Sequence, residues 1–291
     1  MLLTNTNINT LPFYKTKEEQ WHRREGCEYH PIFVPTTNIT PFQLATPHRA
    51  VSSVTELKYN VLLYDYSDIY IKNIDSICDT GYVNESGYSI FTNKGAEVPG
   101  LLESGKLYYI KIQVYNDLNG ILDTFYSDLF EAGNGIDNII KLTYWNEKNI
   151  DYGDYKIVSH MYLQDYTFPF ISYFNSEIGR PGYEFINDIS ERNGLEYPLV
   201  LRSNKTFTFP ITVNEPQMDA LRLAAISDQI AIEQGDNLYK VFWLEFSEIE
   251  WEQNGIGTVY ITFKVNAMIN KTSPAASNRG DFNNDFNEDF L

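Results

Sequence analysis

The chain has 291 residues, of which 43% are apolar and 15% aromatic, and its formal net charge is −17. The length predicts two domains with real hydrophobic cores, and the aromatic content favours strands over helices. The acidic balance argues against nonspecific binding to a phosphate backbone, which needs clustered Lys and Arg, and the 2 cysteines are too few for a disulfide framework.

Residues 1–50 predict an extended N-terminal arm rather than a folded unit. Prolines interrupt every possible element in this segment, because proline fixes φ, lacks a backbone donor and favours an extended conformation before it. A segment of this kind cannot bury its own apolar side chains, so they must lie on the body of the protein or on a neighbouring subunit. The aromatic anchors that we take as candidates for partner docking are Phe13, Trp21, Phe33 and Phe42.

Residues 51–148 predict the first β domain, because the apolar pattern changes there to a period of two. The alternation is clearest at residues 106–115, where the apolar side chains fall on one face and Lys111 and Gln113 fall on the other. Turn signals rich in Gly and Asn separate the expected strands. These strands span residues 58–64, 68–74, 87–91, 106–115, 125–131 and 139–145.

A short motif opens the strand at residues 106–115. Leu102, Gly105 and Tyr108 follow one another at intervals of three residues. This spacing resembles the tyrosine corner of fibronectin-III-like sandwiches, in which the tyrosine hydroxyl bonds to backbone near the turn. The resemblance implies an immunoglobulin- or fibronectin-III-like β-sandwich for this domain. The open alternative is another antiparallel sandwich, in which Tyr108 is only a core aromatic.

Residues 149–271 predict a second β domain with one short helix. Asn214 can cap a helix near residues 215–227, with Gln217 at the capping-box position. Asn254-Gly255 predicts a hairpin near the end of the domain, because both residues accept positive φ. The expected strands of this domain span residues 157–162, 168–174, 205–213, 229–233, 238–246 and 257–266.

Residues 272–291 form an acidic tail in which Asp-Phe recurs every four residues. If the tail becomes helical, Phe282, Phe286 and Phe290 share one face. Alone in water it is too short and too charged to fold. The tail is either a peptide that docks its phenylalanines into a partner groove or a disordered, solubilising end, and both interpretations stay open.

The sequence contains no constellation that predicts catalysis. It lacks a Gly-rich phosphate loop and a Gly-x-Ser-x-Gly nucleophile elbow. Glu248, Glu250 and Glu252 alternate along one strand, which predicts a solvated acidic stripe rather than the two opposed carboxylates of a glycosidase. We therefore expect that the protein is not an enzyme and has neither catalytic residues nor a cofactor.

Metal binding is not expected either. His22, Cys27 and His30 lie close together in the sequence. A structural zinc site usually takes four ligands in two tight pairs, and this segment offers one cysteine without a partner pair. Surface or packed histidines are the simpler interpretation.

Six short motifs occur in order along the chain. They are Leu11-Pro12-Phe13-Tyr14, Thr40-Pro41-Phe42-Gln43, Phe125-Tyr126-Ser127-Asp128-Leu129-Phe130, Ile178-Gly179-Arg180-Pro181-Gly182-Tyr183-Glu184, Met218-Asp219-Ala220-Leu221-Arg222-Leu223 and Trp251-Glu252-Gln253-Asn254-Gly255. This layout is similar to that of structural virion proteins in phages and prophages of Bacteroidetes bacteria, the crAss-like phages included. The resemblance implies a non-enzymatic part of the collar, ring or tail assembly below the portal, and it carries over no catalytic residue.

The same resemblance implies a homo-oligomeric ring whose arms and tail dock on neighbouring subunits and on other virion proteins, such as portal, ring or tail subunits. It implies a location in the virion after synthesis in the bacterial host cytoplasm. The sequence shows neither a signal-peptide pattern nor the ~20-residue apolar run of a membrane helix, so no membrane association is expected. DNA then passes through the ring without specific binding. The alternative is a β module that recognises a host glycan or receptor through exposed Tyr and Trp side chains.

Overall fold

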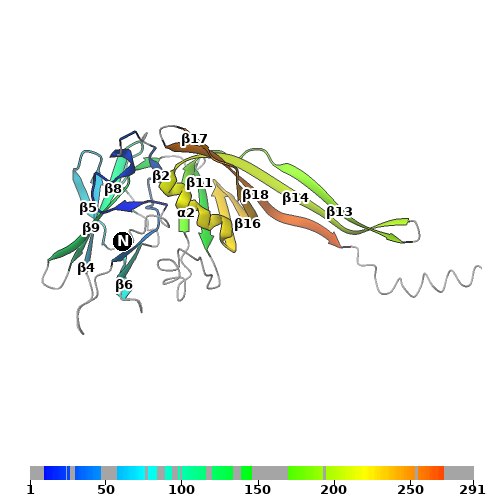
Figure 1. The fold of residues 1–291 in the computed structure, drawn as a ribbon, viewed down its shortest axis with the longest axis horizontal. Helices are drawn as coiled ribbons and strands as arrows, with labels where there is room; N and C mark the ends of the chain where they lie inside the picture. Colours follow the sequence, from blue (N-terminus) through cyan, green and yellow to red (C-terminus); the bar gives the residue numbers. More distant parts are fainter. Residues whose placement is uncertain are drawn as a thin grey trace, which may run out of the picture.

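The computed structural model describes residues 10–23, 25–26, 30–46, 58–75, 78–83, 89–93, 98, 100–115, 120–133, 139–145, 170–192, 195–252 and 255–271. These residues form a mainly β structure with a single α-helix, as the sequence predicts. The strands form one 15-stranded sheet and a separate 3-stranded sheet. Figure 1 shows an elongated molecule in which two bodies lie side by side and a ribbon of strands projects from the second body.

The first body is built from two sheets that enclose one core. The smaller sheet has the order β3-β7-β6, and its Phe42 packs in one apolar cluster with Val61 and Ile112 of the larger sheet. This arrangement is compatible with an immunoglobulin-like sandwich. The strands of this body are β1 (Phe13–Tyr14), β2 (Ile32–Pro35), β3 (Phe42–Thr46), β4 (Lys58–Asp65), β5 (Tyr70–Asn73), β6 (Cys78–Val83), β7 (Ser89–Asn93), β8 (Leu107–Tyr115), β9 (Ile121–Ser127) and β10 (Phe130–Gly133).

The described part of the N-terminal segment belongs to this body and is not a free arm. β1 pairs with β9, and β2 pairs in parallel with β10, so the segment adds strands to the sheet. Pro12 and Pro41 directly precede β1 and β3, a place where a missing backbone donor is tolerated. Phe13, Trp21 and Phe42 are buried within the same chain. Contrary to the prediction, these three residues are not available for partner docking, because the first body itself supplies the surface that covers them.

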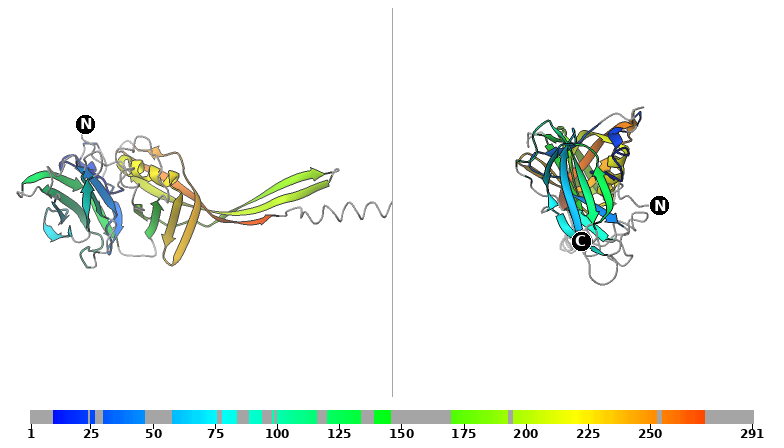
Figure 2. Two further views of the ribbon diagram at one scale, coloured as in Figure 1. Left: turned by 90° about the horizontal axis from the view of Figure 1, so that it is seen from below. Right: turned by 90° about the vertical axis from the view of Figure 1, so that its left-hand side faces the viewer.

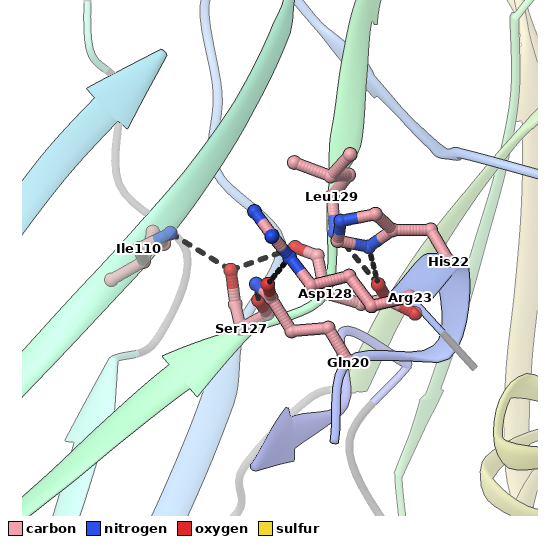
Figure 3. A network of polar contacts seen from close by, with 7 residues as sticks. All are labelled: Gln20, His22, Arg23, Ile110, Ser127, Asp128 and Leu129. Atoms are coloured by element: carbon pink, nitrogen blue, oxygen red, sulfur yellow. Dashed lines mark hydrogen bonds and ion pairs between the residues drawn. The ribbon is translucent and has the colours of Figure 1, made fainter. Parts of the chain in front are cut away.

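A buried polar network fastens this segment, including the 3-10 helix η2 (Trp21–Arg23), to the strands behind it (Figure 3). Gln20 Nε2 donates to the backbone carbonyl of Ser127 at 2.6 Å, and His22 Nδ1 lies 3.0 Å from Asp128 Oδ1. The Ser127 hydroxyl accepts from the Ile110 N–H and donates to the Asp128 carbonyl, each at 2.8 Å. Buried polar groups lose their hydrogen bonds to water, so each of these contacts avoids the cost of an unsatisfied group.

The tyrosine corner predicted from Leu102, Gly105 and Tyr108 is confirmed. The Tyr108 hydroxyl accepts a hydrogen bond from the backbone N–H of Glu103 at 2.8 Å. Gly105 has a φ of 75°, a left-handed conformation that glycine adopts without steric cost. The buried Tyr108 ring stacks on Phe130 at a centroid distance of 5.9 Å. The motif therefore ties the turn before β8 to the core of the first body.

The second body has its own core, which lies between α2 and one face of a long antiparallel sheet. The sheet order is β12-β11-β15-β16-β18-β14-β13, and β17 pairs with β18 beside this path. Figure 1 shows α2 lying across these strands. The elements are β11 (Ile139–Trp145), β12 (Phe170–Asn175), β13 (Gly182–Arg192), β14 (Leu195–Asn214), α2 (Glu215–Ile226), β15 (Gln229–Gln234), β16 (Asn237–Phe246), β17 (Glu250–Trp251) and β18 (Ile256–Lys271).

The boundary between the bodies differs from the predicted one. The predicted first domain, residues 51–148, includes β11, but the structure pairs β11 with β12 and β15 of the second body. Ile140, Leu142 and Tyr144 of β11 pack in the second core. Period-two alternation is the same in both bodies, so it identifies β11 as a strand without telling which core the strand covers.

The helix α2 begins as the sequence predicts. The Asn214 side chain accepts from the Gln217 backbone N–H at 2.9 Å, and the Gln217 side chain accepts from the Asn214 backbone N–H at 2.9 Å. This reciprocal pair is a capping box, which satisfies two backbone donors at the helix start. Leu221 and Leu223 are buried in the second core, so the box fixes the helix where its apolar face meets the sheet.

β2 joins the two bodies. Phe33 of β2 pairs with Tyr173 of β12, which makes the larger sheet continuous across the junction. The Phe33 side chain is partly buried against the first core, and its ring lies directly over Gly133 of β10. Phe33, a predicted docking residue, thus makes contacts within its own chain, at the junction of the two bodies.

Candidate functional site

The candidate functional site is a ribbon of three strands that leaves the second body. β14 lies between β13 and β18 and pairs with both. It has 20 residues, which at about 3.3 Å per residue makes a strand roughly 65 Å long. Strands of globular proteins usually have roughly 3–10 residues. Figures 1 and 2 show that the excess length projects away from the body, together with β13 and the end of β18.

One face of the ribbon continues the sheet face that covers the second core. Phe207 and Phe209 of β14 are buried in that core. Lys205 lies two residues before Phe207, on the same face, and pairs with Tyr183 of β13, so Tyr183 and Phe185 also lie on this face. These two aromatic residues are 62% and 74% exposed. We call the surface formed by Tyr183 and Phe185 the aromatic face.

The opposite face of the ribbon carries polar contacts near the body. Glu184 Oε2 accepts from Asn204 Nδ2 at 3.0 Å and from Lys264 Nζ at 3.1 Å, so one carboxylate links β13 to both other strands. The hydrogen bond from Asn204, followed by that from Lys264, lowers the pKa of Glu184. Lys264 Nζ also lies 4.9 Å from the centroid of the Trp243 ring. The ribbon is thus two-faced, and its polar side holds the three strands together where they leave the body.

The outer edge of β13 is the end of the sheet order, with β14 as the pairing strand on its other side. An edge strand presents backbone N–H and C=O groups that can pair with another chain, and natural proteins usually cover such an edge or shorten it. β13 is 11 residues long. Four apolar residues of this strand are exposed, namely Tyr183, Phe185, Ile186 and Ile189. A long edge beside exposed aromatic residues is typical of a surface that contacts another protein.

The ribbon also differs in charge from the rest of the chain. Residues 180–206 and 264–271 contain 6 Lys and Arg and 4 Asp and Glu, a net charge of +2. The chain holds 22 basic and 39 acidic residues in total, so the remainder has 16 basic and 35 acidic residues and a net charge of −19. The ribbon is therefore electrostatically attracted to an acidic surface, such as the one that the remainder of this chain presents.

Sequence reasoning did not predict this ribbon. No strand was expected at β13, and the strand expected at residues 205–213 covers only the half of β14 nearest the body. A signal was nevertheless available, because Asn193-Gly194 stands between β13 and β14 and is a strong hairpin dipeptide. That signal predicts the hairpin but not its projection beyond the core.

A second aromatic surface lies at the turn between β4 and β5, and we call it the tyrosine patch. It consists of Tyr66 and Tyr70, which are 58% and 52% exposed, beside Asp68. Asp68 has a φ of 65°, and its Oδ1 accepts from Lys17 Nζ at 2.5 Å and from the Tyr109 hydroxyl at 2.7 Å. The hydrogen bonds from Lys17 and then Tyr109 lower the pKa of Asp68, while burial and the bond to Asp68 raise that of Tyr109.

Ser127, His22 and Asp128 come together without forming a catalytic triad. The Ser127 hydroxyl is fully buried and is engaged with the Ile110 N–H and the Asp128 carbonyl. A nucleophilic serine must instead bond to the histidine base and be reachable by substrate. Figure 3 shows His22 directed at the Asp128 carboxylate, so the trio fastens the N-terminal segment.

The predicted polar candidates are distributed over the molecule. His22 bonds to Asp128, Cys27 lies outside the described residues, and His30 lines a cavity of about 270 Å³ between the two bodies. In the part of the chain that the structure describes, no group of three or more His, Cys, Asp and Glu could hold a metal ion. Glu248, Glu250 and Glu252 are exposed on and around β17. The remaining docking candidates, Phe282, Phe286 and Phe290, lie outside the described residues.

A scan against protein-family models finds no match to the chain, and a search of curated proteins finds none either. Among the described residues, no helix is long and apolar enough to cross a membrane.

Proposed function

We propose that this chain is a non-enzymatic structural component of a phage virion and forms a ring in the collar or tail assembly near the portal. The observation that carries this proposal is the projecting ribbon, whose exposed aromatic face continues the buried face of the second core. Burying an aromatic or aliphatic side chain contributes about 1.5–3 kcal/mol. A partner that covers Tyr183 and Phe185 is bound more tightly by this contribution, whereas both side chains stay exposed to water in a free monomer.

The shape of the chain favours a ring over a closed pair. The ribbon and the bodies are different surfaces, and the projecting ribbon can reach the body of a neighbour that gives its own ribbon to a third subunit, which is a heterologous contact. Repeated heterologous contacts close into a ring when the rotation between subunits permits it. In this proposal the ribbon has the docking role that was predicted for the N-terminal arm, while the tail with Phe282, Phe286 and Phe290 remains a further docking candidate.

The virion setting is supported by the likeness to structural phage proteins and by the charge. A net charge of −17 repels DNA, so a ring of such subunits allows DNA to slide through without specific binding. The partners in this proposal are other copies of the chain and the adjoining portal, ring or tail subunits. Subunits are made in the bacterial host cytoplasm and end in the particle.

Imaging of intact particles tests the proposal. Particles from the host that encodes this chain are purified on a density gradient, the chain is identified by mass spectrometry, and its density is located by averaging. We expect a closed ring around the DNA channel. Recovery of the chain only in the soluble lysate, or density that forms isolated surface projections, would contradict the proposal.

Incorporation of variants tests the ribbon specifically. Deleting residues 1–50 is unsuitable, because it removes β1, β2 and β3 from the first body. The double variant Tyr183→Ser, Phe185→Ser changes only exposed side chains and should reduce incorporation into particles. Ile226→Ser is the matched control, because Ile226 is an exposed apolar residue at the end of α2, away from the ribbon. Equal incorporation of both variants would exclude the aromatic face as a docking surface.

The second candidate function is a module that binds a host glycan or receptor, and the tyrosine patch favours it. Tyr66 and Tyr70 offer exposed rings, and the carboxylate of Asp68, which lies between them in the sequence, is held in place by Lys17 and Tyr109. Aromatic rings with a nearby polar group suit a ligand that is apolar on one side and polar on the other. A glycan array probed with the full chain and with Tyr66→Ala, Tyr70→Ala tests this function. Binding that is lost in the variant supports it, and an array without hits excludes it.

A further inference from the structure

We infer that the ribbon docks on a second copy of this chain, and that its aromatic face packs on an acidic sheet face of the second body in the neighbouring copy. This inference rests on the proposed ring, because it names the surface that each ribbon meets. Three features of the chain support this contact: the charge of the ribbon, the chemistry of the receiving face and the positions of the two surfaces on the sheet.

Charge favours a copy of the same chain as the occupant. The ribbon carries +2, and the remainder of the chain carries −19. Lys205 lies on the aromatic face beside Tyr183, so one of the basic residues of the ribbon is at the contact surface itself. A second copy offers the acidic surface that this arrangement fits, and opposite charges bring such surfaces together and orient them.

The receiving face is the side of the second-body sheet that points away from its core. On β18, Ile261 is buried in the core, and the neighbouring Tyr260 points to the other side and is exposed. Glu245 of β16 and Glu250 of β17 pair with Thr262 and Thr258, so they share this side with Tyr260. We call the surface formed by Glu245, Glu250 and Tyr260 the acidic face; Trp243 and Lys264 lie on the same side, toward the ribbon, where Glu184 accepts from Lys264.

The acidic face complements the aromatic face of the ribbon in charge and in apolar contact. Glu245 and Glu250 complement Lys205, and the Tyr260 ring offers an apolar contact for Tyr183 and Phe185. Two β surfaces pack face to face at about 10 Å, a separation that aromatic side chains fill well. Glu248 and Glu252, which precede and follow β17, are exposed as well.

The positions of the two surfaces make the contact intermolecular. The aromatic face lies on the side of the sheet that carries the core residues Phe207 and Phe209, whereas the acidic face lies on the opposite side. Within one chain the two surfaces therefore cannot meet, and the ribbon itself points away from both bodies (Figure 2). When each copy gives its ribbon to one neighbour and receives a ribbon from another, the contacts have the heterologous arrangement of a ring.

Photo-crosslinking of the full chain tests the contact. A benzoylphenylalanine is placed at position 185 in light protein, which is mixed with nitrogen-15-labelled protein and irradiated. We expect crosslinks from light β13 to heavy peptides that contain Glu245 or Glu250. The matched control carries the same probe at Ile226, which is exposed on the end of α2, and it should give no crosslinks to that region. Crosslinks from position 185 to other regions, or none between light and heavy chains, would overturn the inference.

A charge exchange provides the second test. Lys205→Glu and Glu250→Lys should each weaken self-association, measured by sedimentation at low salt, by roughly tenfold or more, because each places like charges in contact. The combination Lys205→Glu, Glu250→Lys should restore much of the lost affinity, because it places opposite charges in contact again. Asp236→Lys, an equal charge change in the β15–β16 turn, is the control and should leave self-association unchanged. A combination that remains as weak as the single variants would count against the pairing.

The virion role and the docking contact between copies can be contradicted separately. If the chain is missing from particles but position 185 crosslinks to the acidic face of another copy, the virion role is wrong and the docking contact stands. If the chain forms a ring in particles but position 185 crosslinks to a different virion protein, the ring stands and the second copy is excluded as the occupant.

Discussion

The ring of Phe33 lies directly over Gly133, so closely that a Cβ at residue 133 would fall 1.7 Å from Phe33 Cζ. Phe33 also pairs with Tyr173 across the junction between the two bodies. The glycine therefore makes room for the side chain of a residue whose backbone pairing joins the two bodies.

The first prediction concerns this contact. Gly133→Ala should destabilise the protein by roughly 1–3 kcal/mol, because the new methyl group displaces the Phe33 ring. Phe33→Leu removes part of the clash, so the double variant should lose less stability than the sum of the two single variants. Urea unfolding of the four proteins measures the difference. Strict additivity would show that the ring does not occupy this place.

The second prediction concerns the tyrosine corner. Tyr108→Phe keeps the buried ring but removes the hydroxyl that accepts from the Glu103 N–H. Leaving that donor without its partner should cost roughly 1–3 kcal/mol in the free energy of unfolding. Tyr66→Phe, at an exposed position, is the control and should change the stability little. If both variants unfold at the same urea concentration, the corner does not stabilise the first body.

The third prediction contrasts two phenylalanines on the same side of the ribbon sheet. Phe209→Ala should destabilise the second body by roughly 3–5 kcal/mol, because it opens a cavity in the core. Phe185→Ala should leave the thermal midpoint of the isolated monomer nearly unchanged, because that residue is exposed. Calorimetry on both variants measures the contrast. A large loss for Phe185→Ala would mean that its side chain is buried within the monomer.

The fourth prediction concerns pH. The hydrogen bonds from Lys17 and Tyr109 hold the pKa of Asp68 below its ordinary value of 3.8. The folded state thus favours the ionised form, so the contribution of Asp68 to stability is present above the unfolded pKa and is lost as pH falls through the folded pKa. Carbon-13 NMR titration of the carboxyl group measures this value, which should rise in Lys17→Met. The control, Lys72→Met in β5, should leave it unchanged, and an unshifted value in Lys17→Met would rule out the ion pair.

Local patterns in the sequence were sufficient for several parts of the fold. The capping box at Asn214 and Gln217 depends on neighbours three residues apart, so the sequence contains both partners. The tyrosine corner depends on Gly105 and Tyr108, which are equally close. Alternation likewise predicted β8, whose Ile110 and other apolar residues are buried on the expected face. Interactions over a few residues do not depend on the rest of the chain, which is why these predictions hold.

Only the tertiary structure decided which apolar faces are covered. Phe13 belongs to a proline-interrupted segment that suggests a free arm, yet β9 offers it a pairing edge and the first core covers it. Phe185 and Phe209 are both aromatic residues on the same side of the sheet, yet one lies exposed on the ribbon and the other is buried in the second core. Period-two alternation determines which face of a strand is apolar, but burial depends on what packs against that face. That partner comes from distant segments of the chain or, for the aromatic face in our proposal, from another copy.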